Sequence, residues 1–207
     1  MIAYTNGSMK EKEREHWTGA GWVVYWKGME RRCRRKGMGR VAEVYDAEIL
    51  ALLRGLETAM KLQQEMPGTN RRRTRIILFA DNTASVTAIT KEAPGLSPET
   101  SQKFAETAIS FPDENRQAMI EVSWAPGYMG IEGNDRADKL AKEATNLKPA
   151  IETTTIVKLH WQLRKNLKTE WISEWANKLL TGRYTIADRI PPFWQDHTRS
   201  AHSTDIH

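Results

Sequence analysis

Three acidic residues are placed so that their carboxylates can converge on one point. Asp81 follows the apolar run 76–80, which is expected to form a buried strand, and open α/β sheets bind ligands at that strand end. Glu48 and Asp138 border the apolar stripes of two predicted helices, the second after a glycine-rich loop. Carboxylates are the ligands that Mg²⁺ and Mn²⁺ prefer. Two such ions about 4 Å apart activate water and stabilise the leaving oxygen in phosphodiester hydrolysis.

Each acid also has a plainer interpretation when it is taken alone. Asp81 is well placed to cap the helix that follows it. Glu48 and Asp138 are equally compatible with solvated positions at the edge of an apolar stripe. The three positions together favour a metal site over three unrelated surface acids.

The elements that would position these acids follow from hydrophobic periodicity. The predicted strands are 2–5, 18–26, 29–36, 76–80 and 119–124, and the predicted helices are 44–64, 82–90, 97–109 and 135–144. The run 76–80 is expected at the centre of the sheet, covered on both faces. Charges on both faces of 29–36 place that strand at an edge. The order predicts an α/β fold with a five-stranded mixed sheet and helices on both faces.

The dipeptide Asn6-Gly7 is typical of a hairpin turn, because both residues accept positive φ. The charged run after it has no period of two, and the next strand-like run begins only near Thr18. We therefore interpret Asn6-Gly7 as the end of the strand 2–5 and not as a turn.

Composition limits the possible classes of protein. The 207 residues carry 31 basic and 26 acidic side chains, a net charge of +5 that leans weakly toward nucleic acid. The single cysteine, Cys33, excludes an internal disulfide and indicates a reducing compartment inside the cell, the cytoplasm or nucleus. No apolar run approaches the ~20 residues of a membrane span. The length suits one domain, residues 1–147, with a tail at 148–207.

The tail contains a predicted amphipathic helix that ends near Gly182. Its apolar stripe consists of Ile156, Leu159, Leu163, Leu167, Trp171, Trp175 and Leu179. A stripe of this size is expected to be buried, either against residues 1–146 or against a partner.

Four stretches resemble a known family when they are taken together. YTNGS, YDAEILALLRGLETA, FADNTASV and WAPGYMGIEGNDRADKLAKEA, in this order, are similar to the four signature blocks of type-1 ribonuclease H (RNase H). They resemble in particular the domain that follows the reverse transcriptase in non-LTR retrotransposons. The resemblance covers residues 2–146 and implies an RNase H-like fold and hydrolysis of the RNA strand of RNA–DNA hybrids.

The resemblance also implies roles for individual residues. Position 6, Glu48, Asp81 and Asp138 would hold two Mg²⁺ or Mn²⁺ ions, and position 128 would assist proton transfer or product release. The residues Gly7, Ser8, Asn82 and Asn134 would contact the substrate, whose 2′-hydroxyls distinguish RNA from DNA.

Two of these positions depart from the family pattern. Asn6 stands where the family has its first aspartate, so that one negative charge is missing from the ligand set. Tyr128 stands where the family usually has histidine, and a phenol with a pKa near 10 cannot replace imidazole at neutral pH. We expect little or no hybrid cleavage, through loss of at least one metal ion.

Two functions therefore remain open. One is an impaired hybrid ribonuclease, and the other is an inactive nucleic-acid-binding or interaction module of the same fold. The basic clusters 31–36 and 71–73 with Arg75 are candidate phosphate contacts, or else solvated edges. The tail stretch EWISEWANKLLTGRYTIADRIPPFW is similar to a segment downstream of the domain in such polyproteins. It suggests a reverse transcriptase domain or another protein as its partner.

Overall fold

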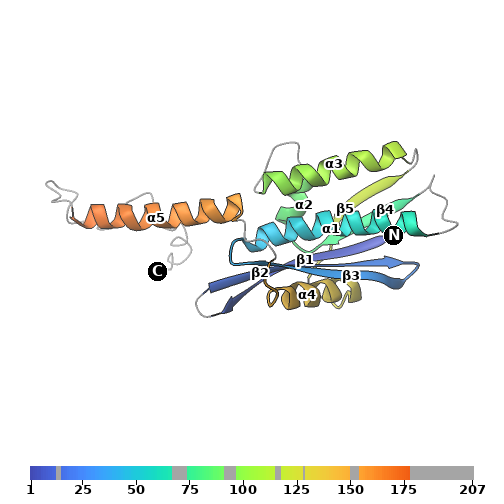
Figure 1. The fold of residues 1–207 in the computed structure, drawn as a ribbon, viewed down its shortest axis with the longest axis horizontal. Coiled ribbons are helices and arrows are strands. Elements are labelled where there is room, and N and C mark those ends of the chain that lie inside the picture. The colour runs from blue at the N-terminus through green and yellow to red at the C-terminus, as the bar shows by residue number, and fades with distance from the viewer. Residues whose placement is uncertain are drawn as a thin grey trace, which may run out of the picture. The chain divides into compact units, whose positions relative to one another are not determined.

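The computed structural model describes residues 1–12, 15–66, 74–90, 97–114, 118–127, 129–149 and 154–177. It contains a five-stranded sheet in the order β3-β2-β1-β4-β5 (Figure 1). Strand β2 is antiparallel to both β1 and β3, and β4 runs parallel to both β1 and β5. The predicted mixed α/β sheet of five strands is confirmed.

Strands β1 (Ile2–Lys12) and β2 (Glu15–Trp26) form a hairpin that is longer than expected. Pairing runs residue by residue from Ile2 with Tyr25 to Lys12 with Glu15. Asn6 pairs with Gly21 inside this ladder, so Asn6-Gly7 is not a turn, as predicted. The predicted strand end at residue 5 is wrong. The backbone ladder continues through the charged run because its side chains at 9–11 point into solvent and need no alternating apolar face.

Strand β3 (Met29–Gly39) lies at the edge of the sheet, as its charges predicted. Arg32 forms an ion pair with Glu65 of α1, and Arg35 forms one with Glu143 of α4, so alternate side chains face opposite sides of the sheet. The other basic side chains of the strand, Arg31, Arg34 and Lys36, are exposed and make no ion pair with another described residue. Residues 71–73 lie outside the described residues, and Arg75 pairs with Glu121.

The helices form a layer on each side of the sheet (Figure 1). Helices α1 (Val44–Glu65), α2 (Thr83–Thr90) and α3 (Pro98–Glu114) lie on one side, and α4 (Glu132–Ala144) packs on β1, β2 and β3 on the other. The middle strand is β1 and not, as predicted, β4 (Arg75–Ala80).

Strand β4 is also less covered than its apolar run suggested. Ile76, Leu78 and Ala80 are fully buried toward α1, but Ile77 and Phe79 on the opposite face are only half-buried. Phe79 stacks on Tyr4 with 5.2 Å between the ring centroids. An unbroken apolar run therefore does not require helices on both faces, because an aromatic neighbour on β1 provides part of the cover.

Two helix boundaries differ from the expected ones. Helix α4 begins at Glu132, three positions before the predicted start, which places Asn134 on a helix instead of a loop. Helix α3 continues to Glu114, beyond the predicted end near Ile109. The Asp135 N–H donates to the Ile131 carbonyl oxygen at 3.0 Å, an intrahelical hydrogen bond that places the helix start before Asp135.

Helix α4 approaches the sheet closely because β2 presents glycine to it. A Cβ atom built on Gly21 would lie 2.6 Å from the Ala137 carbonyl oxygen and 2.8 Å from the Leu140 carbonyl carbon. These are backbone atoms, which cannot rotate away. The absence of a side chain at Gly21 thus sets the distance between α4 and the sheet.

The segment after α4 is attached to the amino-terminal end of α1. The Asp46 carboxylate accepts hydrogen bonds from Thr155 Oγ1 at 2.6 Å, from the Glu43 N–H at 2.9 Å and from the Ser97 hydroxyl. Lys158 Nζ pairs with Glu43 at 2.7 Å, and Val157 is buried. This cluster joins the first turns of α1, α3 and α5 (Ile156–Asn177).

The chain divides into two compact units, residues 1–158 and 159–207. Within the second unit, Leu163, Leu167 and Trp171 of α5 are 56%, 50% and 48% exposed, so this unit does not itself provide the burial expected for the stripe. The Trp175 side chain, Leu179 and the predicted end at Gly182 lie outside the described residues. Which partner covers this stripe stays a prediction.

Among the described helices, none combines the length and the apolar character needed to cross a membrane.

Replacing Gly21 by alanine is expected to lower the free energy of unfolding by about 1–3 kcal/mol, because the new methyl group would displace the α4 backbone. Urea unfolding measures this as a lower midpoint at an unchanged slope. Lys10→Ala, at an exposed position of the same sheet, serves as the control and should leave the midpoint unchanged. Equal midpoints for Gly21→Ala and the parent would mean that the helix does not depend on this contact.

Candidate active site

The site is built where the parallel pairing of β1 with β4 ends, at the end of β4 and in the middle of β1. Thr5 pairs with Ala80, so the next residues, Asn6 and Asp81, leave this register together. The Asn6 side chain donates a hydrogen bond from Nδ2 to Asp81 Oδ2 at 2.9 Å. Asn6 is buried, with 4% of its surface exposed. A neutral amide is therefore held against the carboxylate that the sequence singled out.

Glu48 reaches the same place from α1. A Cβ atom on Gly7 would lie 2.7 Å from the Glu48 backbone nitrogen and 2.9 Å from the Val44 carbonyl oxygen, so only glycine lets this turn of the helix contact β1. The Gly7 N–H donates to the Glu48 carboxylate, and Glu48 is 4% exposed. The close approach thus delivers a buried carboxyl group to the strand.

Burial and mutual repulsion perturb both carboxyl groups. Desolvation, followed by repulsion from Asp81 and Asp138, raises the pKa of Glu48 to about 8, against a weaker opposing effect of the Gly7 N–H. The pKa of Asp81 is also raised, mainly by burial and then by Asp138, while hydrogen bonds from Asn6 and Asn134 oppose the rise. Perturbed carboxyl groups of this kind are common at functional sites.

Helix α4 contributes Asn134 and Asp138. Asn134 is buried and donates from its side chain to Asp81. Asp138 interacts electrostatically with both Glu48 and Asp81, but its own carboxylate pairs with Lys142 at 2.6 Å, one turn further along the helix. The residues predicted from sequence thus come together, with Asn6, Glu48, Asp81 and Asn134 in the closest association.

Three further predicted site residues, Asn82, Ser8 and Tyr128, are not part of this group. The Asn82 side-chain oxygen accepts from the Ala84 and Ser85 N–H groups at 2.9 and 3.3 Å, so it caps α2 and only its amide nitrogen is left for a substrate. Ser8 is half-buried on β1. Tyr128 lies outside the described residues.

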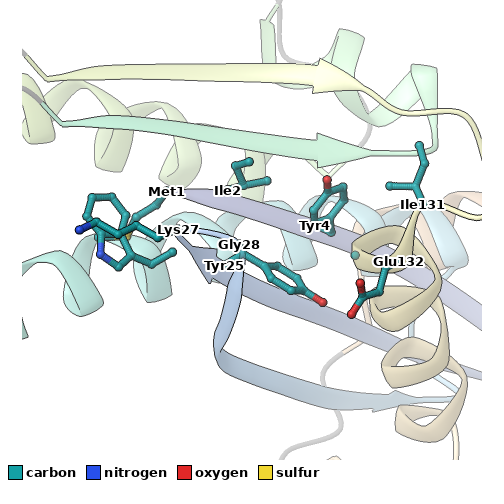
Figure 2. Close-up of a pocket in the computed structure, with 10 residues that line it drawn as sticks. Met1, Ile2, Tyr4, Tyr25, Lys27, Gly28, Ile131 and Glu132 are labelled. Atoms are coloured by element: carbon teal, nitrogen blue, oxygen red, sulfur yellow. The ribbon is translucent and has the colours of Figure 1, made fainter.

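A separate hollow of about 380 Å³ opens on the α4 side of the sheet (Figure 2). Its lining includes Ile2, Tyr4, Tyr25, Lys27 and Glu132. None of the predicted site residues lines it. Gly133, which lines the hollow, contributes to the site indirectly. A side chain at this position would collide with the Tyr4 ring, and α4 could not then begin next to Asn134.

One residue beside Asp81 was not predicted as a site residue. Trp124 ends β5 (Met119–Trp124), and its indole nitrogen donates to the Asp81 carbonyl oxygen at 3.0 Å. By alternation Ile120, Val122 and Trp124 share one face of the strand, but Ile120 and Val122 are half-buried whereas Trp124 is 51% exposed. The available signal was its position at a strand end, next to the strand that delivers Asp81.

The donor set suits a hard divalent cation. Glu48 Oε2 and Asn134 Oδ1 are buried oxygen atoms with no hydrogen-bond partner among the described residues. A cation beside them would also relieve the repulsion that raises the pKa of Glu48 and Asp81. Among all the residues that the structure describes, no group of three or more His, Cys, Asp and Glu side chains is arranged to hold a metal ion. Asn6 supplies an N–H donor where a further carboxylate would have faced such an ion.

Comparison with known proteins adds a family and a fold. The model of the family RNase H matches residues 1–146. Among curated proteins, no sequence matches the chain. RNase H1 from the halophilic archaeon Halobacterium salinarum NRC-1 is 23% identical with a TM-score of 0.50, and the alignment covers 70% of this chain and 96% of that chain.

Two further solved structures are similar. LC11-RNase H1 in complex with RNA/DNA hybrid is 22% identical with a TM-score of 0.51, over 70% of this chain and 96% of that one. The Prototype Foamy Virus protease-reverse transcriptase is 20% identical with a TM-score of 0.50, over 71% of this chain but only 21% of that one. At these identities the structures show a shared fold.

Replacing Glu48 by glutamine is expected to stabilise the metal-free protein at high pH. The folded pKa of about 8 exceeds the usual value of 4.5, so the folded state keeps this proton between those pH values while the unfolded state has lost it. Stability contributed by the carboxyl group therefore falls as pH rises from 4.5 to 8. Glu48→Gln should gain up to about 5 kcal/mol at pH 9 and nothing at pH 4.

Urea unfolding of parent and Glu48→Gln between pH 4 and 9, in EDTA, measures this difference. Glu57→Gln, on a less buried turn of the same helix, is the matched control and should show no comparable pH dependence. A parent–Glu48→Gln difference that stays constant with pH would contradict the burial of an ionisable carboxyl group at this position.

Proposed function

The chain belongs to the RNase H family, and from this premise we propose that it binds RNA–DNA hybrids at the Asn6–Glu48–Asp81 site and cleaves their RNA strand poorly or not at all. The carrying observation is the hydrogen bond from Asn6 Nδ2 to Asp81 Oδ2 at 2.9 Å. The donor of this bond is a neutral amide at position 6, where the family resemblance places an aspartate. The fold shared with an RNase H1 solved on an RNA/DNA hybrid supports the choice of substrate.

The metal requirement of the proposed reaction rests on Glu48, Asp81 and Asp138. These carboxylates would hold Mg²⁺ or Mn²⁺, which when bound lowers the pKa of water and offsets charge on the phosphodiester. The amide of Asn6 already satisfies one Asp81 oxygen, and it has no charge to balance a second ion. Lys142 competes for Asp138 in the same way. The proposal is therefore that the site holds one ion where efficient hydrolysis needs two.

The protein groups have defined tasks in this scheme. Asn134 and Asn6 hold the Asp81 side chain in place by donating to it from two elements. The Gly7 N–H orients the Glu48 carboxylate. In the metal-free protein Glu48 carries a proton below about pH 8, so binding a cation there requires loss of that proton.

The same hydrogen bond favours a second candidate, a binding module without turnover. A donor at Asn6 stabilises Asp81 without any ion, so the site is preserved as a structure even when hydrolysis fails. Backbone groups at Gly7 and Ser8, and the Asn82 amide nitrogen, would then contact 2′-hydroxyls of the RNA strand. Cleavage and binding measurements distinguish the two candidates.

We further propose that the domain derives from the type that follows a reverse transcriptase in non-LTR retrotransposons. Its four sequence blocks and the tail stretch from Glu170 to Trp194 support this origin. The match to one fifth of a viral protease-reverse transcriptase chain is consistent with such an arrangement. The exposed stripe on α5 would then contact a polymerase domain or another protein.

Restoring aspartate at position 6 is expected to raise Mg²⁺-dependent cleavage of a labelled hybrid about a thousandfold. The new carboxylate supplies the missing charge, and about 4 kcal/mol of transition-state stabilisation corresponds to that factor. Tyr128→His should add a smaller increase only in the Asn6→Asp protein. The initial rate of RNA cleavage, separated on a denaturing gel, is the measurement.

The double variant Asn6→Asp/Asp81→Asn keeps the number of carboxylates constant and serves as the control, because it moves one of them away from β4. It should remain as slow as the parent. A second measurement follows the melting temperature on Mg²⁺ addition, which should rise more for Asn6→Asp than for the parent. Equal cleavage by parent and Asn6→Asp would rule out a metal-site role for Asn6.

Hybrid affinity is expected to fall with salt, because basic side chains displace counterions from phosphates. Three contacts predict a slope of about −3 when log K is plotted against log salt. Arg34 and Lys36, which are exposed and make no ion pair with another described residue, are the first candidates for phosphate contacts. The double variant Arg34→Gln/Lys36→Gln should reduce the magnitude of the slope by about 2. Arg35→Gln is the control, since Arg35 already pairs with Glu143. A slope near zero for the parent would remove nucleic acid as a partner.

A further inference from the structure

Trp124 combines exposure with a fixed position beside the site. Half of its surface, 51%, is exposed. Ile120 and Val122, which lie on the same face of β5, pack on the main core cluster, whereas Trp124 does not belong to that cluster. The residue therefore keeps a large aromatic surface in solvent at the strand end where Asp81 also emerges.

The ring is held there from two directions. Its indole nitrogen donates to the Asp81 carbonyl oxygen at 3.0 Å, and the next residue, Ala125, donates from its N–H to the Ala80 carbonyl oxygen at 2.9 Å. These bonds tie the end of β5 to the end of β4. An indole that is anchored by its N–H loses little further freedom when a flat ligand stacks on it.

The surroundings indicate which ligand would stack there. Asp81 and Asn82 are half-exposed polar neighbours, and Thr83 beyond them is exposed. A protein partner would more typically require a continuous apolar patch, which these residues do not provide. A single aromatic face bordered by polar groups is instead the arrangement that binds nucleobases, because every base has a π-face and polar edges.

We propose that Trp124 forms a stacking subsite for a base of the nucleic acid bound at Asp81. The inference rests on the proposed function and extends it, since it assigns a base-contacting residue that makes no use of charge. Substrate affinity then has two separable parts, a salt-dependent part from basic side chains and a salt-independent part from this ring.

The test compares two substitutions that separate stacking from hydrogen bonding. Trp124→Phe keeps an aromatic face but loses the N–H bond to Asp81, and Trp124→Ala loses both. Affinity for a fluorescently labelled RNA–DNA hybrid is measured by anisotropy in Mg²⁺ at low temperature, with the RNA checked for integrity afterwards. Trp124→Ala should weaken binding about tenfold or more, and Trp124→Phe should stay within about threefold of the parent.

The salt slope provides a second readout, which should be the same for the parent and Trp124→Ala because no phosphate contact is lost. Met119→Ala is the matched control. Met119 is 56% exposed at the other end of β5, and its replacement should leave affinity unchanged. Melting temperatures of all variants verify that the sheet is intact.

Each outcome decides the proposal. Equal weakening by Trp124→Phe and Trp124→Ala would overturn stacking and show that the indole only positions Asp81. Unchanged affinity for Trp124→Ala, beside a parent that binds hybrid, would overturn this inference alone. Absence of hybrid binding by the parent would overturn both the inference and the proposed function.

Discussion

Burial of the Glu48 carboxyl group beside the half-buried Asp81 carboxyl group is the constraint on which the site depends. Desolvation disfavours ionisation of both groups, Asp81 further raises the pKa of Glu48, and Asp138 raises the pKa of both. The protein compensates with three donors from two elements: the Asn6 amide and the Gly7 N–H on β1, and the Asn134 amide on α4. One Glu48 oxygen and one Asn134 oxygen are still left without a partner among the described residues. The described residues thus compensate the site only in part.

The fold serves this constraint by bringing helices unusually near the sheet. Gly7 admits α1 from one face and Gly21 admits α4 from the other, in both cases because a side chain would strike helix backbone. The parallel register of β1 and β4 then places Asn6, in the middle of β1, beside Asp81 at the end of β4. Three glycines, Gly7, Gly21 and Gly133, the last of which packs against the Tyr4 ring, therefore do more to define the site than any single charged group.

Asn6 changes the balance between structure and chemistry at this point. An amide that donates to Asp81 provides locally part of the stabilisation that a bound cation would otherwise provide, without carrying charge. The arrangement favours a site that is stable when empty over one that assembles with its ions. Two residues before Glu48, Asp46 accepts hydrogen bonds from Glu43 and, from segments distant in sequence, Thr155 and Ser97. The helix carrying Glu48 is thereby fixed at its first turn.

The sequence alone determined the strand and helix order, the edge position of β3, and the grouping of Glu48, Asp81 and Asp138. Period, charge alternation and strand-end position are local properties, and ordered motif blocks carry the family. The sequence did not predict the length of the β1–β2 hairpin, because ladder hydrogen bonds sustain a strand whose exposed side chains have no hydrophobic pattern. The expected cover on both faces of β4 is also only partly present, since Ile77 and Phe79 are half-buried.

Only the tertiary structure decided how the charges are balanced. The sequence placed an uncharged residue at position 6, but its contact with Asp81 depends on the register between two strands separated by more than 60 residues. The raised pKa of Glu48 likewise depends on how closely α1 approaches Gly7. Such quantities follow from distances between elements, and the residue order along the chain determines them only through packing.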